Sequence, residues 1–328
     1  MNRIFSSPLA AAIKSYLQLR LSLGFNIETT VATLTEFDRY LVKRFPEATT
    51  VTAQIVVDYL ETTNPLQSCT RHNRLSQLRQ FCRFLFQLNP ETYIPAAQLL
   101  PPKRVTRTPH LYTLEQVTAL IHLANGLRPV GSIRPSTYAT LLGLLWVTGL
   151  RIGEALRLNL QDVDYEHGLL HIQQTKNFKS RLVPLNASTV QALSDYCKQR
   201  SNHCADHRPT APFFINNRGH RYSRTPIKRT FSQLISQLGL KTAQGKAPRL
   251  HDFRHSFATR SLTAFYQAGE EPTAYLPVLA TFLGHTHITG AQVYLHPSPD
   301  LLETAAERFR AHVLDVHQLL RGGNDEEL

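Results

Sequence analysis

A proline-rich stretch divides this chain into two parts. Five prolines interrupt any helical or strand periodicity between Asn89 and His110: Pro90, Pro95, Pro101, Pro102 and Pro109. Because proline lacks a backbone donor and has a fixed φ, such a run cannot form a long regular element. The same stretch carries the basic residues Lys103, Arg104 and Arg107. It predicts an extended linker over residues 101–112, and 328 residues suffice for a core on either side of it.

The part before the linker, residues 1–100, has the apolar periodicity of helices. One helix face is marked by apolar residues at three- and four-residue spacing, Val31, Leu34, Phe37, Leu41 and Phe45. A shorter helix is expected after Thr52, a residue type that caps helix N-termini. The next helix, over about 71–88, carries a row of arginines on its polar side: Arg71, Arg74, Arg79 and Arg83. Such a row suits a DNA phosphate backbone or an ordinary solvated face.

After the linker, helical periodicity resumes behind Thr113, another expected N-cap. The pattern then changes to two strands, Leu169–Gln174 and Arg181–Leu185, joined by a hairpin loop over 175–180. Residues 213–215 are a candidate third strand. The chain is therefore predicted to be mainly α-helical with a small β-sheet.

Helices are expected again in the last third of the chain. Thr225 should cap a helix that has Pro226 at its first position, with Lys228 and Arg229 in its first two turns. Everything from residue 251 to about residue 320 reads as helical.

The net charge favours a polyanionic partner. The chain carries 36 Lys and Arg against 24 Asp and Glu, which gives +12 and a pI near 9.7. Nucleic acid is the usual partner of such a surplus, although ordinary surface charge is the alternative. The four cysteines form no C-x-x-C pair, and no segment reaches the roughly 18 consecutive apolar residues of a membrane span. The expectation is a cytoplasmic protein without a membrane anchor.

Three motifs in a fixed order carry the chemistry. Residues 148–154 read Thr-Gly-Leu-Arg-Ile-Gly-Glu, and residues 251–255 read His-Asp-Phe-Arg-His. Leu283-Gly284-His285 follows, with His285 nine residues before Tyr294. Attack on a phosphodiester without a metal needs positive hydrogen-bond donors, a nucleophile and an acid for the leaving group. Two arginines, two histidines and a tyrosine supply that set.

This arrangement resembles the catalytic domain of the tyrosine recombinases, the phage-type integrases and Xer-type enzymes. The stretch before Leu283 is longer than in most Xer-type enzymes and looks like that of transposon-borne integrases. The resemblance covers about residues 113–310. It implies an N-terminal helical core-binding (SAM-like) domain over 1–100 and an α+β catalytic domain over 113–310. A C-terminal tail over 311–328 would dock on a neighbouring protomer or on its own domain.

The resemblance also assigns catalytic roles. Two arginines would clamp the scissile phosphate, two histidines would bind its oxygens and manage protons, and a hairpin lysine would protonate the leaving 5′ oxygen. A tyrosine would attack phosphorus and form a 3′-phosphotyrosine. In that order these residues are Arg151 and Arg254, His251 and His285, Lys176, and Tyr294. Lys179 competes with Lys176 for the acid. The further DNA contacts would be Arg71, Arg74, Arg79, Arg83, Lys103, Arg104, Arg107, Lys228 and Arg229.

The implied function is site-specific recombination or integration of DNA, without metal, cofactor or ATP. The implied partners are double-stranded DNA with paired recombination sites and further copies of the chain, as a tetramer on DNA. Integration, excision, transposition of a mobile element and multimer resolution stay open, as do accessory proteins. The alternatives are a type IB topoisomerase and a catalytically silent helical DNA-binding regulator.

Zinc offers a different reading of two histidine-containing groups. His251 and His255 have the i, i+4 spacing of zinc hydrolases, but Asp252 stands where those enzymes need Glu. A second group comprises Cys197, His203, Cys204 and His207, in a spacing that fits no standard zinc module.

Overall fold

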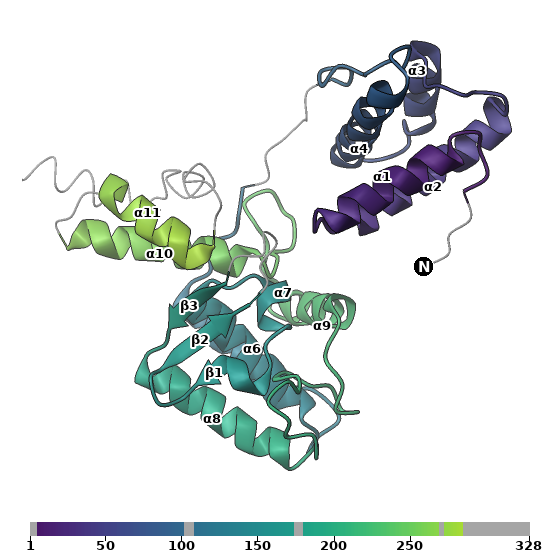
Figure 1. Cartoon of the computed structure of the whole chain (residues 1–328). Coiled ribbons are helices and arrows are strands. Elements are labelled where there is room, and N and C mark those ends of the chain that lie inside the picture. The colour runs from purple at the N-terminus through teal and green to yellow at the C-terminus, as the bar shows by residue number, and fades with distance from the viewer. Residues whose placement is uncertain (1–4, 102–107, 174–179, 269–271, 285–328) are drawn as a thin grey trace, which may run out of the picture. The chain divides into compact units, whose positions relative to one another are not determined.

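The chain forms two compact units that meet in sequence at residues 107 and 108. The computed structural model describes residues 5–101, 108–173, 180–268 and 272–284 (Figure 1). Helices dominate both units, and one small sheet lies in the second unit. The predicted fold class, mainly α with a small β-sheet, is confirmed. Among the described residues, no helix combines the length and the apolar character that crossing a bilayer requires.

The first unit packs four helices around one apolar core: α1 (Ala10–Ser22), α2 (Glu28–Arg44), α3 (Ala53–Thr62) and α4 (Ser68–Leu88). The predicted stripe on α2 supplies Leu34, Phe37 and Leu41, all fully buried in that core. The predicted N-cap of α3 is also confirmed, because the Thr52 hydroxyl accepts a hydrogen bond from the Ile55 amide at 3.3 Å.

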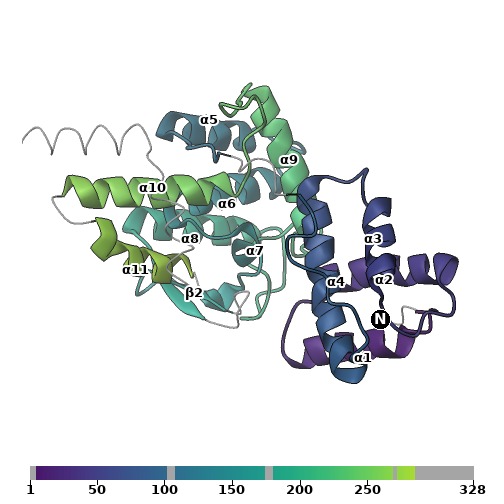
Figure 2. The same cartoon turned by 90° about the horizontal axis from the view of Figure 1, so that it is seen from above.

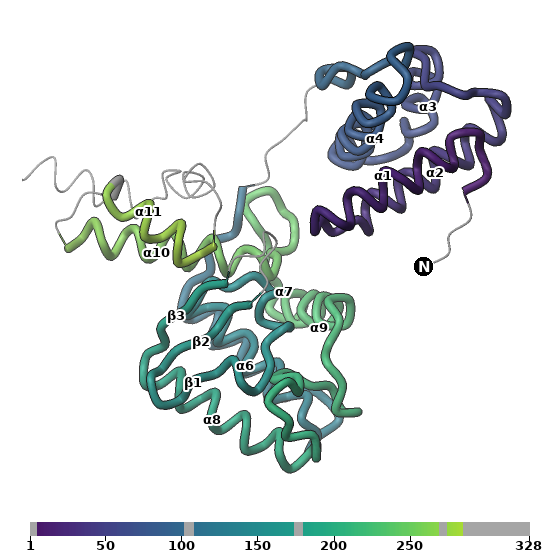
Figure 3. Tube along the Cα trace, in the orientation of Figure 1, coloured from purple at the N-terminus to yellow at the C-terminus, as the bar shows by residue number. Residues whose placement is uncertain are grey.

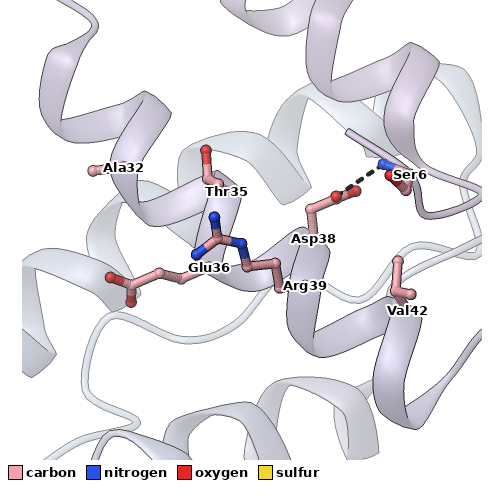
Figure 4. Close-up of a pocket in the computed structure, with 7 residues that line it drawn as sticks. All are labelled: Ser6, Ala32, Thr35, Glu36, Asp38, Arg39 and Val42. Atoms are coloured by element: carbon pink, nitrogen blue, oxygen red, sulfur yellow. Dashed lines mark hydrogen bonds between the residues drawn. The ribbon is translucent and has the colours of Figure 1, made fainter. Parts of the chain in front are cut away.

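A buried carboxylate ties the start of the chain to α2. Asp38 accepts a hydrogen bond from the Ser6 amide at 2.9 Å (Figure 4). It also accepts hydrogen bonds from the Ser7 amide at 3.1 Å and from the Ser7 hydroxyl at 2.6 Å. These bonds satisfy a charge that would otherwise be costly to bury. A pocket beside Asp38 is lined by residues of α2 and by Ser6.

The second unit is built around α6 (Arg134–Thr148), whose buried face packs against α5 (Leu114–Asn125), α8 (Ala187–Ser201) and α10 (Asp252–Gln267) (Figures 1 and 2). The remaining helices are α7 (Ile152–Ala155), the 3-10 turn η1 (Leu160–Asp162), α9 (Arg224–Gln237) and α11 (Pro272–Leu283). Thr113 caps α5 as predicted, in a capping box with Gln116. Helices α10 and α11 confirm the helical expectation up to residue 283, and residues 285–320 lie outside the described part.

The sheet is a three-stranded antiparallel meander in the order β1 (Val163–Asp164), β2 (Leu169–Ile172), β3 (Arg181–Pro184) (Figure 3). In the β2–β3 pair, Leu170 lies opposite Val183, and both side chains are fully buried. The two predicted strands are thus confirmed with slightly earlier ends. Most of the predicted hairpin loop falls on residues 174–179, outside the described part.

Two local predictions were wrong. Residues 213–215 form no strand of the sheet: this segment has only the isolated bridges Asn159–Pro212 and Ile215–Arg221 at its ends. Its apolar side chains are fully buried as core filling, which an apolar run alone cannot distinguish from a buried strand. Helix α9 is capped at Ser223, not at Thr225, so Pro226 is its third residue. Proline is still tolerated there because first-turn N–H groups have no partner within the helix.

Candidate active site

A glycine turn places Arg151. Helix α6 ends at Gly149, which has φ 60°, and a Cβ at this position would lie 2.6 Å from Cδ1 of Phe257. Both the backbone conformation and the lack of space require glycine here. The chain reverses through Leu150 and enters α7, with Arg151 as the residue before its first turn. The Thr-Gly-Leu-Arg motif is therefore a turn that presents a guanidinium at the end of α6.

Arg254 is held inside the protein by backbone oxygens. It lies in the first turn of α10 and is 1% exposed. Its Nη1 donates to the Gly149 carbonyl at 3.0 Å, and its Nη2 donates to the Leu283 carbonyl at 2.6 Å. Arg254 therefore connects the end of α6 to the end of α11.

Arg151 reaches the same end of α11. Its Nη1 lies 3.5 Å from the Leu283 carbonyl oxygen, and both Nη atoms lie 3.3 Å from the Gly284 carbonyl oxygen. About a third of its side chain is exposed. Two arginines separated by about a hundred residues of sequence thus share one acceptor, the Leu283 oxygen. The structure brings these two predicted residues together.

Glu154 stands behind Arg151. Its carboxylate is buried and pairs with Arg151 at 2.8 Å and with Arg181 at 2.9 Å. Burial by itself raises the pKa of Glu154, but hydrogen bonds and charge from Arg181, with further hydrogen bonds from Arg151, outweigh it and lower the pKa to about 2. Glu154 therefore stays ionised at neutral and mildly acidic pH and pairs with two guanidiniums.

His251 lies directly before α10, on the surface and three residues from Arg254. Loss of hydration on its protein-facing side, followed by the charges of Arg254 and Arg249, lowers the pKa of its imidazole. The helix start is fixed by Asp252, whose buried carboxylate accepts hydrogen bonds from the amide and the guanidinium of Arg249. A neutral His251 next to Arg254 can accept or relay a proton near neutral pH.

His255 gives an expected pH dependence of stability. Burial, followed by the neighbouring His251 at 5.2 Å between ring centroids, lowers the pKa of His255 from 6.5 to about 4. Between these values the unfolded chain binds a proton that the folded chain does not, so the free energy of unfolding should fall as the pH falls from about 6.5 to 4. Urea unfolding at pH 7 and pH 5 should show a smaller fall for His255→Gln than for the wild-type protein.

His203→Gln provides the control for that measurement. Hydrogen bonds to the carbonyls of Gln199 and Gly131 raise the pKa of His203, so its loss should not reduce the acid sensitivity. An equal fall in His255→Gln and in the wild-type protein would contradict the assignment.

Three of the six predicted catalytic residues, Lys176, His285 and Tyr294, lie outside the described residues. So do Lys103, Arg104 and Arg107 of the linker, and the competitor Lys179. In the sequence, Lys176 falls between β2 and β3, and His285 directly follows Gly284. Described residues close to each in sequence contact the Arg151 group: Arg181, at the start of β3, pairs with Glu154, and the Gly284 oxygen lies 3.3 Å from Arg151.

The predicted DNA-contact arginines of α4 are largely engaged within the first unit. Arg71 donates to the Thr63 hydroxyl, Arg74 pairs with Glu36, and Arg79 donates to the Pro95 carbonyl at 2.8 Å. Arg83 is exposed. On α9, Lys228 and Arg229 are both exposed. The row on α4 thus has a structural use that periodicity alone did not reveal.

Arg181 is a site residue that the sequence reasoning missed. The sequence pattern marks it only as the start of a strand. Its side chain is 9% exposed and forms an ion pair with Glu154. The available signal was an arginine in an apolar strand directly behind the hairpin loop.

The structure does not support a zinc site at either of the two histidine-containing groups. Across the described residues, no three His, Cys, Asp or Glu side chains are grouped so that they could hold a metal ion. His203 instead makes hydrogen bonds to the backbone oxygens of Gln199 and Gly131.

Residues 111–300 match the phage integrase family. The chain belongs to this family. It is 38% identical over 307 residues to a protein named integrase/recombinase y4rB from Sinorhizobium fredii (strain NBRC 101917 / NGR234), which covers 92% of this chain and 97% of the relative. The resemblance inferred from the motifs is confirmed, and with it the enzyme class, a tyrosine-type site-specific recombinase.

Two solved structures share the fold of this phage integrase family member. The Tn1549 transposon integrase in complex with transposon right end DNA has a TM-score of 0.63 at 19% identity, covering 90% of this chain and 98% of that one. A lambda integrase tetramer bound to a Holliday junction has a TM-score of 0.61 at 16% identity, covering 87% of this chain and 76% of that one.

Proposed function

We propose that this recombinase cuts and rejoins DNA at paired sites through Tyr294, with Arg151 and Arg254 as the clamp on the scissile phosphate. The observation that carries the proposal is the shared acceptor: two guanidiniums close enough to bind one oxygen have the spacing that a clamp on one phosphate needs. Guanidiniums suit this task because they stay charged and present a planar fork.

The proposed reaction conserves the bond energy of the DNA backbone. The Tyr294 hydroxyl passes its proton to a neighbouring histidine and its oxygen attacks phosphorus. The bond to the 5′ oxygen breaks, and Lys176 gives that oxygen its proton. A 5′-hydroxyl from a second strand then attacks the phosphotyrosine, and Tyr294 leaves. His251 and His285 would bind the phosphate oxygens and relay protons. The arginines supply the charge stabilisation that a metal would otherwise provide.

The remaining roles follow from the family and the fold. The helical region over 1–100 would hold DNA together with the catalytic domain over 113–310, and the basic residues over 101–112 would follow the backbone between them. The lambda integrase tetramer on a Holliday junction and the Tn1549 complex with transposon end DNA support paired DNA sites, a tetrameric assembly and a mobile-element substrate. The cytoplasm is the proposed location.

The decisive experiment uses a test duplex, defined as a nicked suicide duplex built from paired inverted repeats sought in the DNA that flanks the gene. Incubation with the wild-type protein should give a covalent protein–DNA adduct, and the adduct should form equally in EDTA. Binding without an adduct would favour the silent regulator. Relaxation of a plasmid that lacks the repeats would favour the topoisomerase, and a requirement for added Mg²⁺ would contradict the metal-free mechanism.

The salt dependence of binding tests the proposed contacts on α9. Each phosphate neutralised by a Lys or Arg contributes about 0.9 to the slope of log K against log salt concentration. The pair Lys228→Ala/Arg229→Ala should therefore lower the slope by about 2. Filter binding of the test duplex across a salt series gives the slope. Lys198→Ala on α8 is the matched control, because Lys198 is exposed but pairs with Asp195. Equal slopes in all three proteins would remove the α9 pair from the interface.

A further inference from the structure

Arg181 is the first residue of β3, and its buried guanidinium joins three elements. Its Nη2 and Nη1 donate to the two carboxylate oxygens of Glu154 at 2.9 and 3.4 Å. Its Nε donates to the Phe282 carbonyl at 2.7 Å. One side chain thus connects β3, α7 and the last turn of α11.

Arg181 also lies against the turn that ends α11. Gly284 has φ 68°, and a Cβ at this position would come 2.6 Å from Nη1 of Arg181. The carbonyl of the same glycine lies 3.3 Å from both Nη atoms of Arg151. Three consecutive carbonyls therefore accept hydrogen bonds from arginines: Phe282 from Arg181, Leu283 from Arg254 and Arg151, and Gly284 from Arg151. The last carbonyls of a helix have no partner within the helix and attract cations. This explains why the three guanidiniums bind at the end of α11.

The charge count around Glu154 shows what Arg181 contributes. Arg151 and Arg181 share one carboxylate, which stays ionised because its pKa is about 2. Two guanidiniums and one carboxylate leave this group of three residues with a net positive charge. If Arg181 were absent, Arg151 alone would face Glu154, and its charge would be largely neutralised. Arg151 would also lose the fixed carboxylate that orients it, since Arg181 holds Glu154 from the other side.

We propose that Arg181 is a positioning residue for the phosphate clamp: it shares the charge of Glu154 and fixes the end of α11, so that Arg151 keeps its place and its positive charge. This inference rests on the proposed function of Arg151. It gives Arg181 no contact with DNA.

A charge-neutral scissile group tests this role. The adduct-forming rate is measured on the test duplex with its normal scissile phosphate and on the same duplex with a methylphosphonate at that position. A methylphosphonate carries no negative charge, so it depends less on the charge and position of the clamp. Misplacing a catalytic group by about 1 Å costs roughly 10²-fold in rate, and that is the loss expected for Arg181→Ala on the phosphate. On the methylphosphonate, the loss relative to wild type should be less than about tenfold, since the charge term is absent.

Two further variants keep the test interpretable. Arg181→Lys retains a positive charge without the planar fork, so it should fold and show a smaller loss with the same preference for methylphosphonate. It carries the test if Arg181→Ala does not fold. Arg221→Ala is the matched control, because Arg221 also binds backbone carbonyls, those of Leu156 and Leu158, in the same region. Its methylphosphonate-to-phosphate rate ratio should equal that of the wild-type protein.

The outcomes separate this inference from the proposed function. Equal losses on both substrates for the Arg181 variants would make Arg181 a purely structural residue and overturn the inference alone. Wild-type rates of adduct formation in both Arg181→Ala and Arg181→Lys would also overturn the inference. If the wild-type protein forms no adduct on the phosphate duplex, the proposed function fails, and the inference fails with it.

Discussion

Tyr294→Phe is expected to bind the test duplex as tightly as the wild-type protein and to form no covalent adduct. The substitution removes one oxygen, the proposed nucleophile, and keeps the ring. Because the phosphotyrosine cannot form without that oxygen, the loss should be complete within the detection limit of a denaturing gel. Binding, measured by filter retention at fixed salt concentration, should not change.

Tyr275→Phe on α11 is the matched control for this prediction. Tyr275 stacks on Phe265 with 4.3 Å between ring centroids, and phenylalanine preserves that stacking. This variant should form the adduct at the wild-type rate. An adduct that survives in Tyr294→Phe would assign the nucleophile to another side chain, which peptide mapping of the adduct by mass spectrometry would identify.

Arg254→Ala is expected to lose both cleavage and stability. Removing a single donor that stabilises a transition-state charge costs about 10²–10³-fold in rate. The buried carbonyl of Gly149 would also lose this partner, whereas the Leu283 carbonyl would keep Arg151 at 3.5 Å. At about 1–3 kcal/mol for a buried group left unsatisfied, the free energy of unfolding should fall by about 1–3 kcal/mol. Urea unfolding and adduct formation measure the two losses separately.

Arg254→Lys and Arg260→Ala separate these effects. A lysine keeps the charge but cannot reach both carbonyls as a planar fork does, so cleavage should stay low while part of the stability returns. Arg260 lies on the same helix with its guanidinium 3.6 Å from the centroid of the Trp146 ring, on the surface. Its removal should leave cleavage unchanged. Cleavage at the wild-type rate in Arg254→Lys would show that Arg254 only supports the fold.

Local chemistry explains which elements could be predicted. Thr52 and Thr113 were recognised as N-caps because a threonine hydroxyl satisfies an amide within three residues, which is a property of the sequence itself. The N-cap of α9 is two residues earlier than predicted: Ser223 and Thr225 are both residue types that favour this position, and the Ser223 side chain makes no capping hydrogen bond that would distinguish it. Residues 213–215 were misread as a strand because burial between helices and burial in a sheet leave the same apolar pattern.

The candidate site also has a part that the sequence predicts and a part that it does not. Arg151, His251 and Arg254 could be proposed from the motifs because their residue types and order suit phosphodiester chemistry. Their common attachment to the end of α11 could not, since it depends on how α6, α10 and α11 pack. For Arg181 the apolar strand after the hairpin loop marks the position, but it does not show that the side chain is buried against a carboxylate.

The last turn of α11 offers only main-chain oxygens to the three arginines. Any residue type that keeps this segment helical presents the same oxygens, apart from the glycine at 284. The side chains on the exposed side of α11, where Val278 is 57% exposed, therefore take no part in holding the arginines. Substitutions on that side can change what the helix contacts without changing the oxygens that hold the arginines.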